Sequence, residues 1–196
     1  MMIESDFQIR CPNCQQLSEF TYATSIGVKK KDIGYFKNSK VFKVAESKGW
    51  KAGRTYYYVL HYPYLMPKLE NIDDLPEDYS SEKWRKRLAH GTTSTRIDLG
   101  VVLCSFCNIR QKHELNWPDD AYFQIDYKGE TLWAYNRSYA IKLRDYIASD
   151  DRKKRHPAST ETYIFQDRFL RKIPEHFQTA KARGDIVRKL NKILHP

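Results

Sequence analysis

The sequence predicts an α+β fold in which a β core holds two cysteine pairs, a long basic insert separates the pairs, and a small helical subdomain follows. Three observations lead to this prediction. The four cysteines form two Cys-x-x-Cys pairs, Cys11/Cys14 and Cys104/Cys107, and no cysteine is left over. The segments around both pairs contain β-branched and aromatic stretches that favour strands. From Asn136 onward, apolar residues instead recur at helical spacing.

Length and composition suit a folded protein of one domain, or of one domain with an appendage. The chain has 196 residues, of which 41% are hydrophobic and 30% are charged, which argues against wholesale disorder. No apolar run approaches the roughly 20 residues of a membrane span, and the N-terminus lacks the basic start and apolar core of a signal peptide. We therefore expect a soluble, cytoplasmic protein that does not bind membranes. We expect three parts, which are residues 1–27 with 96–135 as the β core, 28–95 as the insert and 136–196 as the helical subdomain.

Strands are predicted around the first cysteine pair and within the insert. Phe20-Thr-Tyr-Ala-Thr and Thr55-Tyr-Tyr-Tyr-Val-Leu-His-Tyr are rich in residues that favour strands. An acidic surface loop is expected from Glu70 to Glu82. Ser81 can cap a short basic helix over residues 82–90, and a strand over residues 96–103 then leads to the second cysteine pair.

The C-terminal part begins with a predicted hairpin. Residues 121–127 and 131–135 form its arms, and Lys128-Gly129 forms the turn. Asn136 caps a helix, because Tyr139, Ala140, Leu143 and Ile147 follow at helical spacing. Two more helices are predicted over residues 160–171 and 185–194, and the second carries an apolar face of Ile186, Leu190, Ile193 and Leu194.

The complete pairing of the cysteines favours one shared metal ion over disulfides in a reducing compartment. Zinc prefers four thiolates in a tetrahedron, and two residues between cysteines let one tight turn present both sulfurs. Asn108 suits the left-handed backbone that such a turn needs, whereas Gln15 fits it less well. Four thiolates leave no open position, so the site is expected to be structural. Two thiol pairs without metal remain an alternative, and a redox function is disfavoured because no convincing helix follows either pair.

The spacing between the pairs is unusual. Eighty-nine residues separate Cys14 from Cys104, whereas compact zinc modules leave roughly 15–20. We interpret residues 28–95 as an insert whose base is closed by zinc. Loop closure costs only logarithmically more as a loop lengthens, and zinc binding on the order of 10 kcal/mol or more offsets that cost.

The knuckles Cys11-Pro-Asn-Cys14 and Cys104-Ser-Phe-Cys107 resemble those of the zinc-ribbon superfamily. The C-terminal half also resembles bacterial zinc-ribbon proteins without an assigned function, through Cys104, His113-Glu-Leu-Asn-Trp-Pro and Leu132-Trp-Ala-Tyr-Asn. The resemblance implies a zinc-ribbon β core. It also implies binding of nucleic acid or protein, and it names no substrate.

The insert has the composition of a nucleic-acid-binding surface. Residues 28–69 contain ten Lys or Arg against two acids, with nine aromatic residues interleaved. Lysines neutralise phosphates and aromatic rings stack on exposed bases. The alternative is that the rings form the insert's own core and the lysines its solvated face. The candidate contacts are Lys29, Lys30, Lys31, Lys37, Lys40, Lys43, Trp50, Lys51, Arg54 and Tyr57.

Catalytic motifs are weak. The chain has no Gly-rich phosphate loop, serine elbow or His-Glu-x-x-His motif, and its six histidines form no ligand pattern. Pro118-Asp119 followed by Asp126-Tyr-Lys128 resembles the Mg²⁺-dependent nuclease pattern. Its spacing is short, however, and Lys128 falls in the predicted hairpin turn. We therefore expect no enzyme.

The formal net charge of +10 and the pI of about 9.3 make nucleic acid, DNA or RNA, the first partner to consider. The sequence predicts a nucleic-acid-binding protein with one structural Zn²⁺ per chain. The alternative hypothesis is a protein-interaction adaptor in a bacterial mobile-element or phage-defence complex.

Overall fold

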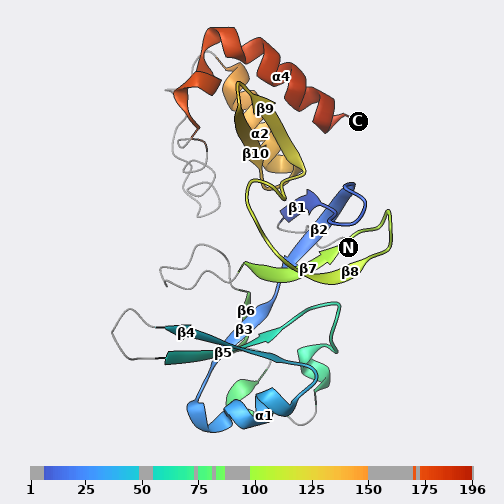
Figure 1. Cartoon of the computed structure of the whole chain (residues 1–196), viewed down its shortest axis with the longest axis vertical. Helices are drawn as coiled ribbons and strands as arrows, with labels where there is room; N and C mark the ends of the chain where they lie inside the picture. Colours follow the sequence, from blue (N-terminus) through green and yellow to red (C-terminus); the bar gives the residue numbers. More distant parts are fainter. Residues whose placement is uncertain are drawn as a thin grey trace. The chain divides into compact units, whose positions relative to one another are not determined.

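The computed structural model describes residues 7–48, 55–72, 75–80, 83–86, 98–149, 170 and 173–195 (Figure 1). Within these ranges it is a mixed structure of antiparallel sheets and three α-helices, so the predicted combination of helices and sheets is confirmed. The chain divides into two compact units, Met1–Leu17 with Trp117–Pro196 and Ser18–Asn116. The division into three parts that the sequence indicates stays a prediction.

One four-stranded sheet has the order β1-β2-β7-β8. Its strands are β1 (Phe7–Arg10), β2 (Leu17–Tyr22), β7 (Leu99–Leu103) and β8 (Arg110–Glu114). Gly100 of β7 lies opposite Tyr22, and a Cβ there would collide with the Phe20 ring and the Thr21 carbonyl oxygen. This position therefore requires glycine. The predicted strands around Phe20 and before Cys104 correspond to β2 and β7.

A second four-stranded sheet has the order β4-β5-β3-β6. Its strands are β3 (Thr24–Val28), β4 (Lys43–Lys48), β5 (Thr55–His61) and β6 (Arg85–Lys86). The predicted strand from Thr55 is thus confirmed as β5. The helix predicted over residues 82–90 is wrong at β6, because Arg85 and Lys86 pair with Ser25 and Thr24 of β3. Residues 87–90 lie outside the described ranges.

Short helices and aromatic side chains complete this part of the chain. The helix α1 (Ile33–Asn38) follows the 3₁₀ turn η1 (Lys30–Asp32), and two further turns are η2 (Leu69–Asn71) and η3 (Glu77–Tyr79). A buried cluster joins α1, β5, η3 and the chain beside β6 through Phe36, Phe42, Val59, Tyr79 and Trp84. Phe42 stacks on Trp84 with their ring centroids 5.4 Å apart. These four rings, of Phe36, Phe42, Tyr79 and Trp84, are therefore core residues.

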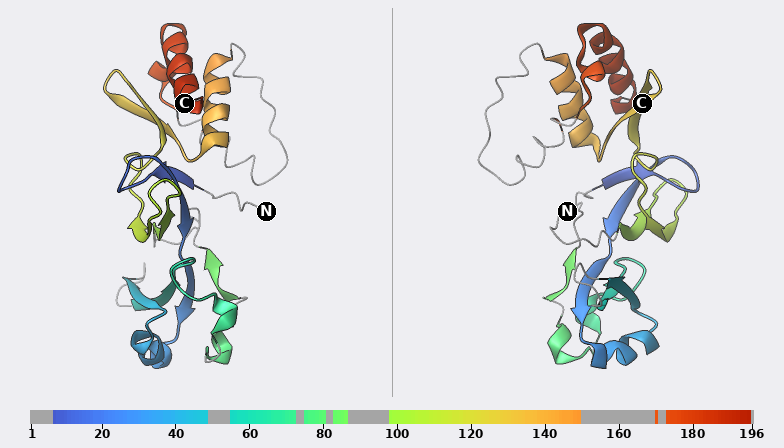
Figure 2. Two further views of the ribbon diagram at one scale, coloured as in Figure 1. Left: turned by 90° about the vertical axis from the view of Figure 1, so that its right-hand side faces the viewer. Right: turned by 60° about the vertical axis from the view of Figure 1, so that its left-hand side comes forward.

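The other unit contains the predicted hairpin, β9 (Phe123–Tyr127) and β10 (Glu130–Ala134). Lys128 and Gly129 have φ of 54° and 82°, as a two-residue hairpin turn with both central residues left-handed requires. The predicted hairpin and turn are therefore confirmed. One face of the hairpin packs against α2 and α4, which lie side by side in two further views (Figure 2).

The two long helices begin at side-chain caps. Asn136 accepts a hydrogen bond from the Tyr139 N–H at 3.0 Å and caps α2 (Arg137–Ala148), as predicted. Thr179 caps α4 (Ala180–Leu194), which begins before the predicted Asp185, and the 3₁₀ turn η6 (Glu175–Gln178) precedes it. The predicted apolar face of α4 is confirmed by the burial of Ile186, Leu190 and Leu194. The helix predicted over residues 160–171 lies outside the described ranges except for Leu170.

No helix in the described part of the chain is both long enough and apolar enough to cross a membrane.

Candidate functional site

The four cysteines come together as one cluster. Their Sγ atoms all lie within 4.8 Å of one another, with Cys11 and Cys104 buried and Cys14 and Cys107 half-buried. Four sulfurs at the zinc–thiolate distance of about 2.3 Å form a tetrahedron with edges of about 3.8 Å. The cluster therefore has the donor atoms and the size for one metal ion such as zinc, as the cysteine spacing predicted.

The first knuckle is a tight turn closed by backbone hydrogen bonds. The Cys11 N–H donates to the Gln16 carbonyl at 2.8 Å, and the Gln15 N–H donates to the Cys11 carbonyl at 2.9 Å. Gln15 has φ of 61°, which is the left-handed conformation that its residue type disfavours. Its side-chain amide also donates to the Cys11 carbonyl, at 3.2 Å, and this bond offsets part of that cost.

The second knuckle repeats this geometry. The Cys104 N–H donates to the Ile109 carbonyl at 3.1 Å, and Asn108 is left-handed with φ of 57°, as predicted. Between its cysteines, Ser105 and Phe106 are exposed. The exposed fraction of Phe106 is 72%, the highest among the exposed large hydrophobic residues of the described chain.

The chemistry of four sulfur ligands is restricted. A tetrahedral ion with four thiolates has no position left for water or substrate, so such a site holds a fold together and does not activate a ligand. Zn²⁺ with four thiolates carries a formal charge of −2. Since the chain's +10 counts the cysteines as neutral, the zinc-bound protein has a formal charge of about +8.

The predicted nucleic-acid contacts are in different environments. Lys29 forms an ion pair with Asp78, with Nζ 2.7 Å from Oδ2, and this pair raises the pKa of Lys29 and lowers that of Asp78. Tyr57 is half-buried on β5, opposite Val28 and Glu46. Trp50, Lys51 and Arg54 lie outside the described residues. The remaining predicted lysines are exposed, namely Lys30, Lys31, Lys37, Lys40 and Lys43.

The single acid within η1 is engaged by a neighbouring turn. The Tyr79 hydroxyl donates to Asp32 Oδ2 at 2.6 Å, and the Lys29 N–H donates to the Tyr79 oxygen at 3.2 Å. Tyr79 is buried, so these bonds hold η1 against η3. Desolvation and the Asp32 carboxylate both raise the pKa of Tyr79, which keeps its hydroxyl a donor.

His61 is a buried histidine on β5. Its Nε2 lies 2.7 Å from the Pro67 carbonyl oxygen, so Nε2 carries the proton and Nδ1 does not. Burial lowers the pKa of His61, which keeps the ring neutral. The ring packs against both Phe42 and Trp84.

The nuclease-like residues are placed on the hairpin and beside it. Asp126 Oδ1 accepts a hydrogen bond from the Thr131 hydroxyl at 2.9 Å, and the Lys128 ammonium lies 5.4 Å from the Tyr127 ring centroid. Asp119 is an exposed residue that precedes β9. Among the described residues, the only group of three or more metal-ligating side chains is the four cysteines. These residues therefore form no carboxylate cluster for Mg²⁺.

Two residues that the sequence did not predict as functional are exposed aromatics, Phe106 and Tyr64. Phe106 could have been found, because a tight turn between two metal ligands cannot bury its middle side chains. Tyr64 has no comparable signal, since its left-handed conformation, with φ of 67°, is visible only in the structure.

No protein-family model, curated protein or solved structure matches the chain.

Proposed function

We propose that this chain is a nucleic-acid-binding protein with a zinc-ribbon-like core, held by one structural Zn²⁺ on Cys11, Cys14, Cys104 and Cys107. One observation carries the proposal. The segment from η1 through α1 to β4 presents five exposed lysines, and the one acid between Lys30 and Lys43, Asp32, is engaged by Tyr79. A polyanion is the partner that such a surface attracts.

The choice of zinc rests on the donor atoms. Thiolate ligands select soft or borderline ions, and a closed four-cysteine tetrahedron is the usual arrangement of structural zinc. Cys14 and Cys104 are separated by 89 residues. The ion therefore closes a long loop, and its binding free energy becomes folding free energy. Elemental analysis of the purified protein should give one zinc per chain.

The choice of nucleic acid rests on charge. The formal charge of the zinc-bound protein, about +8, still favours encounter with a polyanion. Lys30, Lys31, Lys37 and Lys40 are exposed on one short stretch of chain, which concentrates positive charge there. Lys29 is different, because Asp78 already neutralises it.

Fluorescence anisotropy with labelled single- and double-stranded DNA and RNA tests this proposal. The wild-type protein should bind at low salt, and log Kd should rise linearly with log salt concentration. Replacing Lys30, Lys31, Lys37 and Lys40 by Gln should weaken binding and lower that slope by roughly 0.7–0.9 for each lost phosphate contact. Lys29→Gln is the matched control and should have a smaller effect.

The wild-type protein alone can contradict the proposal. If it binds none of these nucleic acids at low salt, nucleic-acid binding is wrong. Co-purification with one stoichiometric protein, together with no such binding, would favour the protein-interaction adaptor.

A further inference from the structure

Tyr64 occupies a strained backbone position and leaves almost half of its side chain exposed. It lies in a turn closed by the Leu65 N–H, which donates to the Tyr62 carbonyl at 3.4 Å. Pro63 precedes it, and its own φ is 67°, so the turn has the pattern in which glycine is preferred at this position. The exposed fraction of Tyr64 is nevertheless 47%. A bulky residue that strains its backbone and stays exposed is better explained by a contact with a ligand than by folding.

Phe106 presents a second exposed ring on a rigid support. Its exposed fraction is 72%, so its burial contributes little to stability. The backbone around it is fixed by the hydrogen bond from Cys104 to Ile109, by the left-handed Asn108 and by the two flanking metal ligands. A ring held in this way loses little entropy when a partner covers it.

Two cations lie on β8, the strand that follows the second knuckle. Arg110 pairs with Leu103 and Lys112 pairs with Val101, so their side chains project from the same face of the sheet, about 7 Å apart along the strand. Both side chains are exposed. Glu114 is next on the same face and ends the basic stretch.

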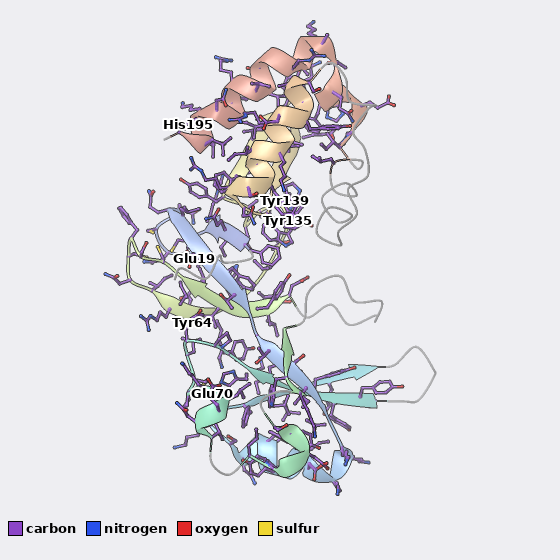
Figure 3. All side chains as sticks on the ribbon, turned by 180° about the vertical axis from the view of Figure 1, so that it is seen from behind. Glu19, Tyr64, Glu70, Tyr135, Tyr139 and His195 are labelled. Carbon is purple, nitrogen blue, oxygen red and sulfur yellow. The ribbon has the colours of Figure 1, made fainter. Side chains whose placement is uncertain are left out.

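At both ends of β8, a contact links the strand to a neighbouring turn. The Lys112 ammonium lies 4.6 Å from the centroid of the Tyr62 ring, two residues before Tyr64, which Figure 3 labels. At the other end, Cys104 and Ile109 close the knuckle that carries Phe106, directly before Arg110. Tyr62 thus links the turn of Tyr64 to Lys112 at one end of β8, and the knuckle links Phe106 to Arg110 at the other. We name Tyr64, Lys112, Arg110 and Phe106 the β8 surface.

The chemistry of the β8 surface points to one class of ligand. Arg110 and Lys112 can neutralise phosphates, and a ring at each end can stack on a base. Bases within a duplex are already stacked on one another, so rings of this kind require unpaired bases. A single strand offers both phosphates and unpaired bases, whereas a duplex offers only the phosphates.

We propose that the β8 surface binds single-stranded nucleic acid, with Tyr64 and Phe106 stacking on bases and Arg110 and Lys112 contacting phosphates. This inference rests on the proposed function and names its substrate class. It also assigns base stacking to β8 and its neighbours, separately from the lysines of η1 and α1.

The test measures anisotropy of a fluorescein-labelled oligothymidylate with the zinc-bound full chain and its variants. Phe106→Ala and Tyr64→Gly should each raise Kd about 5- to 150-fold without changing the salt slope, which is the range for loss of one stacked base. Arg110→Gln should instead reduce the slope by about 0.7. Tyr56→Ala, another exposed ring, and Asn13→Ala, the equivalent position of the first knuckle, are matched controls and should leave Kd unchanged.

Tyr64→Gly provides a readout that a purely structural function of Tyr64 would not give. Glycine relieves the left-handed strain, so the melting temperature should stay the same or rise while binding weakens. The proposal is overturned if the wild-type protein binds the oligothymidylate and Phe106→Ala and Tyr64→Gly bind it equally well; the proposed function then still stands. It is also overturned if these two variants instead lose a stoichiometric protein partner. Absence of wild-type binding to any nucleic acid would reject the proposed function itself.

Discussion

The two cysteine knuckles have the same backbone geometry but differ in the two residues between their cysteines, which we call the tip. In each, the first cysteine N–H donates to the carbonyl five residues later, and the residue after the second cysteine is left-handed. The first knuckle presents Pro12 and Asn13 to solvent, whereas the second presents Ser105 and Phe106. The turn and its sulfur ligands therefore determine the backbone, and the two middle side chains are left available for another purpose.

The difference between the two tips indicates that the two knuckles have different functions. A polar tip is what solvent exposure alone favours, and Asn13 fits that expectation. An exposed phenylalanine has no such explanation, since it adds apolar surface without burial. Each knuckle thus presents two sulfurs that could hold a metal ion, and the second also presents, in our proposal, a ring that stacks on a base.

The largest expected effect is common to both knuckles. Cys11→Ser and Cys104→Ser should each lower the free energy of unfolding by more than about 4 kcal/mol, because either change removes a ligand of the shared ion. Zinc content and thermal melting measure the effect, and Ser105→Ala is the control. A variant of one knuckle that melts like the wild type would show that the two pairs do not share an ion.

The next largest effect is expected in β7, the strand that leads into the second knuckle. Gly100→Ala would drive a methyl group into the Phe20 ring and the Thr21 carbonyl oxygen of β2. We expect a loss of about 1–3 kcal/mol, as for overpacking. Gly184→Ala in α4, where nothing lies within 4 Å, should instead gain roughly 0.5–1 kcal/mol. Urea unfolding measures both variants, and equal stabilities for them would contradict the collision at Gly100.

A smaller effect is expected from substitutions of Gln15 and Asn108, the left-handed residues of the two knuckles. Asn108→Gln should weaken the second knuckle and Gln15→Asn should strengthen the first, each by less than about 1 kcal/mol, because Asn adopts this conformation more readily. The gain at Gln15 should be the smaller of the two, since its amide bond to Cys11 is lost. Competition with a chelator for zinc measures both changes. Weaker zinc binding by Gln15→Asn would show that the side-chain bond of Gln15 outweighs the backbone preference.

The smallest effect on stability is expected from exchanging the tips. Asn13→Phe and Phe106→Asn should each change the free energy of unfolding by no more than about 0.5 kcal/mol, because both side chains are exposed. Binding of a single strand should be weakened by Phe106→Asn, and Asn13→Phe in that variant should not restore it. Restoration would mean that any exposed ring suffices and that the neighbouring Arg110 and Lys112 are dispensable.

The sequence by itself predicted the features whose signals are local. The cysteine spacing predicted the ligand set, Lys128-Gly129 predicted the hairpin turn, and Asn136 predicted the start of α2. Each of these depends on residues a few positions apart, whose backbone preferences act before any long-range contact forms. The left-handed Asn108 belongs to the same class.

Only the tertiary structure decided which residues are buried and which strands pair. The local sequence around Arg85 and Lys86 predicts a helix, but these residues pair with β3 and form a strand. The local sequence does not contain this information, because the residues of β3 lie far away in the sequence. The sequence left open whether Phe36 and Phe42 are surface or core residues. Their buried cluster with Trp84 shows that they are core residues. The exposure of Tyr64 likewise follows from what packs around its turn. Burial and pairing are properties of the whole chain, so a local pattern cannot specify them.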